Sequence, residues 1–379
     1  MKINSQLRQA NIKKLLLKIR KNGPVSKREL QNQTGFSWGN ISTVTTLLMN
    51  ENYIITSGKE ETSVGRHPEK FDINTNDNYV IGVDFNSEGI LAVLCDLKGR
   101  VINEYRTELK EKNKDCALTQ LFELIENILK QNKLKKVLYI SLAMQGDVNT
   151  EKGISVRISA IDGWKNIEIC KELEEHFGIS TIILHDPDCL LYTEKYFGVL
   201  NGIDTKDALL LRIDHGIGIS AMLGGKIYMG NNGKGCEIAM SVIPNNNGGW
   251  SFLKDVVKES AVEKEFLRLK NENKSCAEIA LLAQNGDKTA VEIFKNLGRA
   301  LSFALSGAIG LLNPEQIILF GKFTTYSCLF LPETERVLED ILGSNMPKIL
   351  LSELGDNNAA VGSALFAADR VIENLKFMD

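Results

Sequence analysis

The sequence lacks long apolar segments. No run approaches the roughly 18 apolar residues of a membrane-spanning helix, and the N-terminal segment MKINSQLRQANIKK has no apolar stretch before a cleavage site. We therefore expect neither a membrane protein nor a secreted one. The seven cysteines are scattered, odd in number and without a C-x-x-C pair, which argues against a disulfide framework and a zinc knuckle. These absences predict a cytoplasmic protein with reduced thiols.

Charge is distributed unevenly along the chain. The net charge is −3, but residues 1–70 carry 12 Lys and Arg against 5 Asp and Glu, which leaves 33 against 43 in the remainder. A basic N-terminal part on an acidic body indicates a polyanionic partner for the first part only. The length of 379 residues predicts two or three domains.

The basic part has the pattern of a helix-turn-helix. Apolar residues recur at one-sided helical spacing over 11–21, the segment Ser26–Glu29 forms a capping box for a second helix, and Ser37 caps a third helix over 38–50. Gly35 makes the turn between the second and third helices. Two short helices joined in this way place the second of them in the major groove of DNA.

The third helix carries polar side chains that suit base edges and phosphates. Strands over 53–56 and 70–73 are expected to form a wing hairpin behind it. The candidate DNA-binding residues are Lys27, Arg28, Ser37, Trp38, Asn40, Ser42, Thr43 and Thr46, with Arg66 and His67 in the wing. The alternative is a small helical oligomerisation module, which the positive charge and the polar third helix disfavour.

A glycine-rich stretch follows in the body, at Leu209–Glu237. It reads as three strands with turns at Gly216–Gly218 and Gly224–Gly225, followed by the loop GNNGKGCE over 230–237. Glycines in such turns permit positive φ and close backbone approach, as a pocket or a phosphate-cradling loop requires. A plain β-meander is the alternative.

Two sets of motifs together resemble one family. The segments SKREL, GFS and IS between residues 26 and 42, followed by GRHP, are similar to the winged helix of regulators in the repressor/ORF/kinase (ROK) family, and GNNGKGCE is similar to a loop that its kinases and regulators share. The resemblance covers 1–379. It implies an α/β chain: a winged helix-turn-helix over 1–74, then a two-lobed, ribonuclease-H-like fold of the actin-like sugar-kinase (ATPase) type, with lobes at 79–190 and 191–379.

The resemblance also implies a sugar site. Asp186 follows the expected strand 181–184 and matches the aspartate that takes a proton from the attacking sugar hydroxyl in kinases, or holds that hydroxyl in members that only bind; helix capping is its alternative. Trp164 is a candidate for stacking on a pyranose, with core packing as the alternative. The candidate effector-binding residues are Ser159, Trp164, His185, Asp186 and Glu237.

The parts that bind nucleotide and zinc depart from the family's pattern. The kinases' first phosphate loop, D-x-G-G-T, reads DFNSE over 84–88, His215 replaces a phosphate-contacting hydroxyl, and Lys322 replaces a glycine of the adenosine-side turn. Glu88 would repel a triphosphate. The family's zinc-binding histidine and cysteines are replaced by AM over 239–240 and PNNNGGW over 244–250. We therefore predict no catalytic activity, no metal and no cofactor.

These observations predict a sugar-responsive transcriptional repressor of carbohydrate-metabolism genes. The expected partners are operator DNA, a small sugar effector of the xylose, glucose or amino-sugar type, and further copies of the chain in a homodimer or tetramer, because paired helix-turn-helix units read half-sites about one helical turn apart. Sugar binding between the lobes would change their closure and release the operator. Two alternatives remain: an active ROK sugar kinase fused to a DNA-binding domain, and an effector-blind repressor whose body only holds the dimer together.

Overall fold

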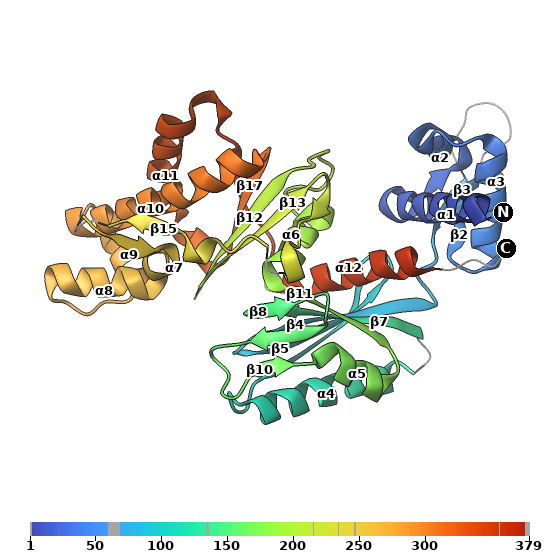
Figure 1. The fold of residues 1–379 in the computed structure, drawn as a ribbon, viewed down its shortest axis with the longest axis horizontal. Coiled ribbons are helices and arrows are strands. Elements are labelled where there is room, and N and C mark those ends of the chain that lie inside the picture. The colour runs from blue at the N-terminus through green and yellow to red at the C-terminus, as the bar shows by residue number, and fades with distance from the viewer. Residues whose placement is uncertain are drawn as a thin grey trace. The chain divides into compact units, whose positions relative to one another are not determined.

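The chain forms two compact units. One comprises Met1–Cys189 with Asn357–Asp379, and the other comprises Leu190–Asp356 (Figure 1). The structure is a computed structural model that describes residues 2–59, 69–133, 136–214, 216–233, 235–245, 248–355 and 357–375. Within these ranges, no helix combines the length and the apolar character needed to cross a bilayer.

A winged helix begins the first unit. Its elements are α1 (Lys2–Asn22), β1 (Val25–Ser26), α2 (Lys27–Thr34), α3 (Trp38–Asn50), β2 (Ile54–Lys59) and β3 (Glu69–Ile73). The strands form an antiparallel sheet in the order β1-β3-β2. α1 buries Ile12, Leu15, Leu16 and Ile19, the stripe read from the sequence, but it begins well before residue 11 because the polar residues ahead of the stripe include no helix breaker.

A five-stranded sheet follows in the same unit. The elements are β4 (Asn78–Phe85), β5 (Gly89–Asp96), β6 (Val101–Glu108), α4 (Lys114–Gln131), β7 (Lys136–Met144), β8 (Asp147–Asn149), β9 (Ile154–Arg157), β10 (Lys165–Ile167), α5 (Ile169–Phe177) and β11 (Ser180–His185). The strand order is β11-β7-β4-β5-β6; β5 runs antiparallel to β4 and β6, whereas β7 and β11 run parallel to β4. Strands β8 to β10 form a small separate sheet.

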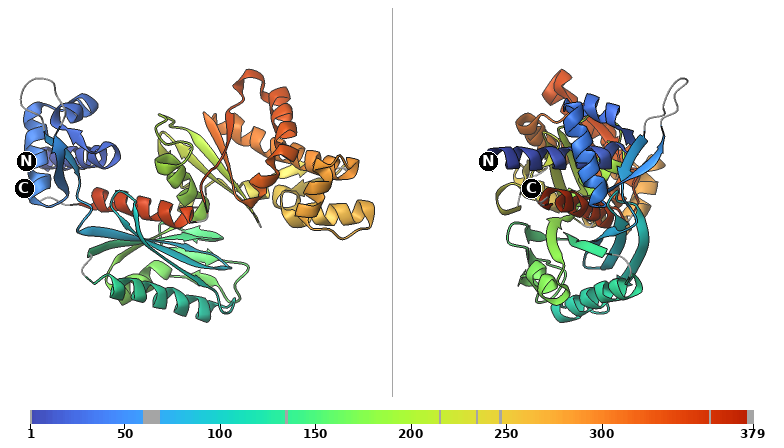
Figure 2. Two further views of the ribbon diagram at one scale, coloured as in Figure 1. Left: turned by 180° about the vertical axis from the view of Figure 1, so that it is seen from behind. Right: turned by 90° about the vertical axis from the view of Figure 1, so that its right-hand side faces the viewer.

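The C-terminal helix α12 (Asn358–Asn374) belongs to this first unit. It packs on β4, β5 and β7, and it lies on the face of the sheet opposite α4 and α5 (Figures 1 and 2). The helix lies so close that a Cβ on Gly82 of β4 would collide with the Ala360 carbonyl oxygen. We expected residues 191–379 to form the second lobe; its C-terminal helix instead completes the first, because glycine and alanine allow it to lie directly on the strands.

The second unit repeats the same sheet. Its elements are α6 (Asp186–Phe197), which begins in the first unit, β12 (Ala208–Ile213), β13 (Ile217–Leu223), β14 (Lys226–Ile227), η1 (Asn231–Gly233), η2 (Ile238–Met240), β15 (Val242–Pro244), β16 (Trp250–Phe252), α7 (Leu253–Val256), α8 (Glu259–Lys270), α9 (Cys276–Gln284), α10 (Lys288–Leu312), β17 (Gln316–Phe320), η3 (Lys322–Tyr326), α11 (Ser327–Leu342), η4 (Gly343–Asn345) and β18 (Lys348–Leu351). The strand order β14-β13-β12-β17-β18, with three antiparallel strands and two added in parallel, matches the first sheet. This duplication confirms the predicted ribonuclease-H-like fold.

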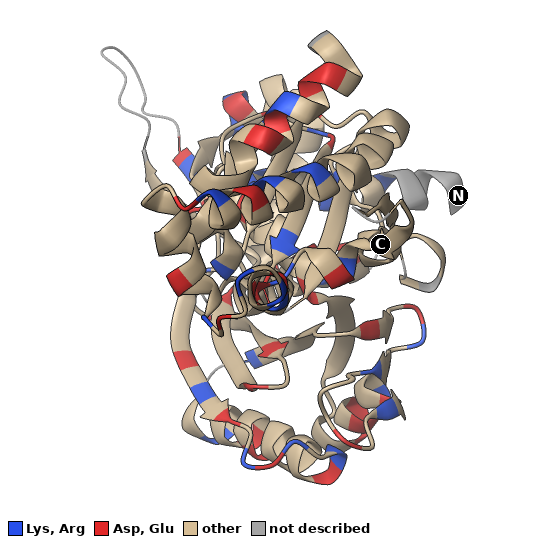
Figure 3. Ribbon diagram, turned by 90° about the vertical axis from the view of Figure 1, so that its left-hand side faces the viewer, with Lys and Arg blue, Asp and Glu red and all other residues tan. Residues whose placement is uncertain are grey.

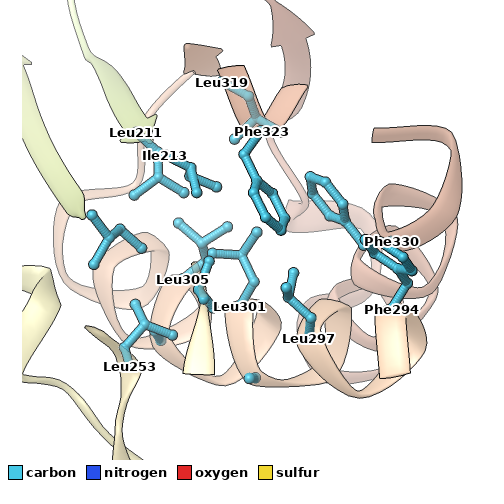
Figure 4. Close-up of a cluster of buried hydrophobic side chains, with 14 of the residues drawn as sticks. Leu211, Ile213, Leu253, Phe294, Leu297, Leu301, Leu305, Leu319, Phe323 and Phe330 are labelled. Carbon is cyan, nitrogen blue, oxygen red and sulfur yellow. The ribbon is translucent and has the colours of Figure 1, made fainter. Parts of the chain in front are cut away.

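Helix α10 supplies much of the second unit's core. Phe294, Leu297, Leu301 and Leu305 lie along one side of it and are buried. In Figure 4 they surround the same apolar space as Leu211, Ile213 and Leu319 of β12 and β17. Each such side chain contributes roughly 1.5–3 kcal/mol on burial. Outside the core, basic and acidic residues are interspersed along the helices (Figure 3).

The segment 250–271 is divided into three elements. Strand β16 is followed by two helices, α7 and α8. Extended backbone at Lys258, with φ −168° and ψ 156°, separates the two helices. The strand pairs with β15, a tertiary contact that helical periodicity does not reveal.

Candidate functional site

The caps predicted for the second and third helices are present. Ser26 caps α2, and its backbone N–H donates to Glu29 Oε2 at 2.7 Å, which lowers the pKa of the Glu29 carboxyl. Gly35 ends α2 with φ 71°. The hydroxyl of Ser37 accepts from the Asn40 N–H at 3.3 Å and starts α3 at Trp38, as predicted.

Helix α3 presents one face to the interior and another to solvent. Ile41, Val44, Thr45 and Leu48 are buried. The candidate DNA-binding residues that are exposed are Arg28, Ser37, Trp38, Thr43 and Thr46, and those that are half-buried are Lys27, Asn40 and Ser42. The Lys27 ammonium donates to the Ser42 hydroxyl at 3.4 Å. Strands β2 and β3 pair as a wing, while Arg66 and His67 lie outside the described residues.

The winged helix is fixed to the first lobe by buried polar contacts. The side chain of Arg20, only 2% exposed, forms an ion pair with Asp369 of α12. Its guanidinium also donates to two backbone oxygens, those of Leu97 and Leu365. Nearby, the Lys98 ammonium donates to Asp72 Oδ2 of β3 at 2.6 Å. The winged helix is therefore attached to the first lobe by more than the connecting chain.

In the loop that corresponds to the kinases' first phosphate loop, the backbone N–H groups are hydrogen-bonded within the protein. The Asn86 side-chain oxygen accepts from the N–H groups of Glu88 and Gly89 at 2.9 and 3.2 Å. The Asn86 N–H donates to the Gly89 carbonyl at 3.1 Å, and the Ser87 N–H donates to Gln145 Oε1 at 2.8 Å. Phosphates bind such loops through outward-pointing backbone N–H groups. Here all four N–H groups from residue 86 to residue 89 donate within the protein.

Carboxylates gather at the carboxyl edge of the first sheet. β4, β7 and β11 are parallel, so Asp84 at the end of β4 and Asp186 directly after β11 lie at the same edge. Both are buried, being 8% and 7% exposed. The Cys189 thiol lies among Asp84, Asp186 and Asp188, and burial first, then these charges, raise the pKa of that thiol well above its usual value. His185 Nε2 lies 3.5 Å from Asp186 Oδ1.

Trp164 belongs to the buried core of the first lobe. Its side chain is 2% exposed, its ring centroid lies 4.9 Å from that of Phe85, and its Nε1–H donates to Ser155 Oγ at 2.8 Å. The prediction that it offers a ring face to a sugar is therefore wrong, and the alternative of core packing holds. Ser159, another candidate effector-binding residue, is exposed in a turn.

In the second unit, Asp214 ties together two loops that face nucleotide in kinases of the resembled type. Asp214 Oδ1 accepts from the backbone N–H of Lys322 at 2.6 Å, and its Oδ2 accepts from Arg212 Nε at 2.7 Å. The charge of this carboxylate is paired with Arg212, and the carboxylate occupies the N–H at the start of η3. His215, the residue singled out in the sequence, lies outside the described residues.

The remaining predicted effector residue, Glu237, is exposed at the start of η2 in the second unit. The following segment forms the β15–β16 hairpin. Among the described residues, no group of three His, Cys, Asp or Glu side chains is arranged to hold a metal ion.

Sequence reasoning missed two side chains, one in each unit. Neither Gln145 nor Asp214 is among the candidate residues named from the sequence. Their hydrogen bonds join segments 58 and 108 residues apart in the sequence. In the sequence, the signal that could have identified these two residues is a polar residue directly after a buried strand.

The chain matches known proteins over almost its whole length. The ROK family profile matches residues 80–370. The xylose repressor of Bacillus subtilis (strain 168) is 23% identical over 378 residues, 97% of each chain. The DNA-binding transcriptional dual regulator NagC of Escherichia coli (strain K12) is 26% identical over 363 residues, which are 90% of this chain and 88% of that protein.

Solved structures share the fold. A ROK family transcriptional regulator, a homolog of the E. coli MLC protein, superimposes with a TM-score of 0.81 at 22% identity, over 97% of this chain and 96% of that chain. The ROK hexokinase from Thermus thermophilus gives a TM-score of 0.68 at 21% identity, over 78% of this chain and 100% of that chain. The match between the family profile and most of the sequence establishes that this chain belongs to the ROK family.

Proposed function

We propose that this chain is a sugar-responsive transcriptional repressor that binds operator DNA through α3 and its wing and senses a sugar without phosphorylating it. The named repressors that resemble it over nearly their full length support this function. The exposed polar face of α3, on a module with a net positive charge, supports DNA binding. A homodimer is expected on a pseudo-palindromic operator.

The loop at residues 86–89 is the observation that carries the second half of this proposal. Phosphoryl transfer depends on positioning the γ-phosphate and neutralising its charge. A loop whose N–H groups donate internally, with the Glu88 carboxylate beside it, supplies neither. In the second unit, the backbone N–H of Lys322 likewise donates within the protein, to Asp214 Oδ1.

Asp186 supports sugar binding and also the second candidate function, an active sugar kinase. A carboxylate at this edge of the sheet can accept hydrogen bonds from sugar hydroxyls or take a proton from one. The loop at 86–89 favours binding alone. An effector-blind repressor is distinguished by a lack of any sugar response.

The DNA-binding half is tested by placing charge on α3. An operator is first selected from a random DNA library with the full-length protein. Thr43→Glu puts a carboxylate against the DNA, and we expect at least a ten-fold rise in Kd in fluorescence anisotropy. Gln284→Glu on α9 adds the same charge at an exposed site of the second unit and should leave Kd unchanged. Equal Kd values for both variants would contradict the assigned interface.

The sensing half is tested by thermal shift with a panel of pentoses, hexoses and amino sugars. A ligand at ~100 times its Kd adds about 2.7 kcal/mol of stability. We expect at least one sugar to raise the melting temperature of the native chain and not that of Asp186→Asn. A uniform lack of response would favour the effector-blind alternative.

A further inference from the structure

Trp38 is the first residue of α3 and is 53% exposed. Of the two other tryptophans, Trp164 is buried in the first lobe and Trp250 lies on the β15–β16 hairpin. A single exposed aromatic residue is not unusual on a protein surface. The position of Trp38 indicates a function, because the N-terminal residues of a recognition helix are those that contact base edges.

The next residue, Gly39, has no structural reason to be glycine. Its φ lies outside the left-handed region, and a Cβ built on it meets no described atom within 4 Å. Gly35 differs, because its φ of +71° ends α2, and so does Gly82, because α12 lies against it. Glycine in a helix costs up to about 1 kcal/mol relative to alanine. Glycine at residue 39 therefore makes the helix less stable, and among the described residues it permits neither a turn nor a close contact.

We propose that Gly39 allows the start of α3 to approach the floor of the major groove closely, and that Trp38 thereby packs on the C5-methyl group of a thymine in each half-site. This inference rests on the proposed function. The indole has one N–H donor and no acceptor, so it cannot make the paired hydrogen bonds that identify guanine or adenine. The thymine methyl is the apolar group that the major groove displays. Trp38 therefore specifies thymine by apolar contact.

The neighbouring side chains fit this placement. Lys27 and Arg28, at the start of α2, supply positive charge for the phosphates, and Lys27 also contacts Ser42, one turn of α3 beyond Trp38. Thr43 lies farther along the exposed face of the helix. Trp38 and Gly39 contact the bases at one end of α3, and Thr43 and Thr46 contact those farther along.

The first test removes single methyl groups from the DNA. Each thymine of the selected operator is replaced in turn by deoxyuridine, which lacks only the C5-methyl, and Kd is measured for the native chain and for Trp38→Ala. Burying one methyl corresponds to about a four-fold change in affinity. We expect one thymine per half-site at which deoxyuridine raises Kd about four-fold for the native chain and less than 1.5-fold for Trp38→Ala.

If the native chain binds its operator and no thymine shows this coupling, the inference is overturned while the proposed function stands. If the native chain selects no operator at all, the proposed function itself fails. Equal sensitivity to the methyl in both proteins would assign the contact to another residue and would also overturn the inference.

The second test separates stability from binding. Gly39→Ala should raise the melting temperature, because alanine favours the helix and no described atom obstructs it, yet it should raise the operator Kd at least five-fold. Gly307→Ala in α10 is the matched control, since its Cβ also meets no described atom within 4 Å; it should raise stability and leave Kd unchanged. Native affinity in Gly39→Ala, a fall in its melting temperature, or a similar loss of affinity in Gly307→Ala would each contradict the proposal.

Discussion

The ion pair between Arg20 and Asp369 offers a quantitative test of how the winged helix is held. The Arg20 side chain is 2% exposed and that of Asp369 is 14% exposed. Replacing Asp369 by alanine removes the carboxylate from a guanidinium that stays buried and keeps its hydrogen bonds to the carbonyl groups of Leu97 and Leu365. Removing one partner of a buried pair costs about 3–5 kcal/mol. We expect Asp369→Ala to lower the free energy of unfolding of the first unit by about 3 kcal/mol.

The natural probe is Trp164, which is buried in the first lobe. In a Trp38→Phe, Trp250→Phe background, its fluorescence during urea unfolding reports the first unit alone. The control is Glu373→Gln, which removes an exposed pair with Arg370 on the same helix; exposed pairs contribute about 0–1 kcal/mol.

A double variant checks the cause of the effect. Arg20→Met with Asp369→Leu replaces both charges by apolar groups and should recover most of the lost stability. If Asp369→Ala destabilises the first unit no more than Glu373→Gln does, the pair does not hold the winged helix and this reasoning is refuted.

Three further predictions concern charge and metal. Arg28→Ala should weaken binding to all DNA sequences and flatten the slope of log K against log[salt] by about one unit, as measured by anisotropy between low and high salt. Arg336, with Arg299, lowers the pKa of Glu333 to about 2. A carboxyl whose pKa is lower in the folded than in the unfolded state stabilises the folded state at pH values above its unfolded pKa. This stabilisation is lost as the pH falls toward 2. Glu333→Gln should therefore cost about 1 kcal/mol at pH 7 and nothing near pH 2, as judged by urea unfolding at both values. Elemental analysis of protein purified without a metal-affinity tag should find less than one zinc per ten chains, and one per chain would contradict the reading of residues 241–250.

Local rules were enough to predict the winged helix from the sequence. Ser26 with Glu29, Gly35 and Ser37 fix the ends of α2 and α3 through hydrogen bonds within a few residues. The same rules could not place α12 in the first lobe. That placement depends on close packing between Gly82 of β4 and the alanine-rich surface of α12, which are far apart in the sequence.

The candidate sugar site was less accessible from sequence. Trp164 was a candidate because of its position in the sequence. The residues that contact it in space, Phe85 and Ser155, are not its neighbours in the chain. The altered phosphate loop was recognised by its missing glycines, but the physical reason became visible only in the hydrogen bonds from residues 86–89 to Asn86 and Gln145. Contacts between distant segments decide which polar groups remain available to a ligand.

The central claim, sensing without phosphorylation, is tested most directly in one cuvette. Full-length protein is bound to fluorescent operator in the presence of ATP and Mg²⁺, the sugar found by thermal shift is added, and anisotropy and ADP release are recorded together. We expect sugar-dependent release of the operator with no sugar-dependent ADP, and no release from Asp186→Asn. Sugar-dependent ADP formation that Asp186→Asn abolishes would contradict the account and make this chain a kinase.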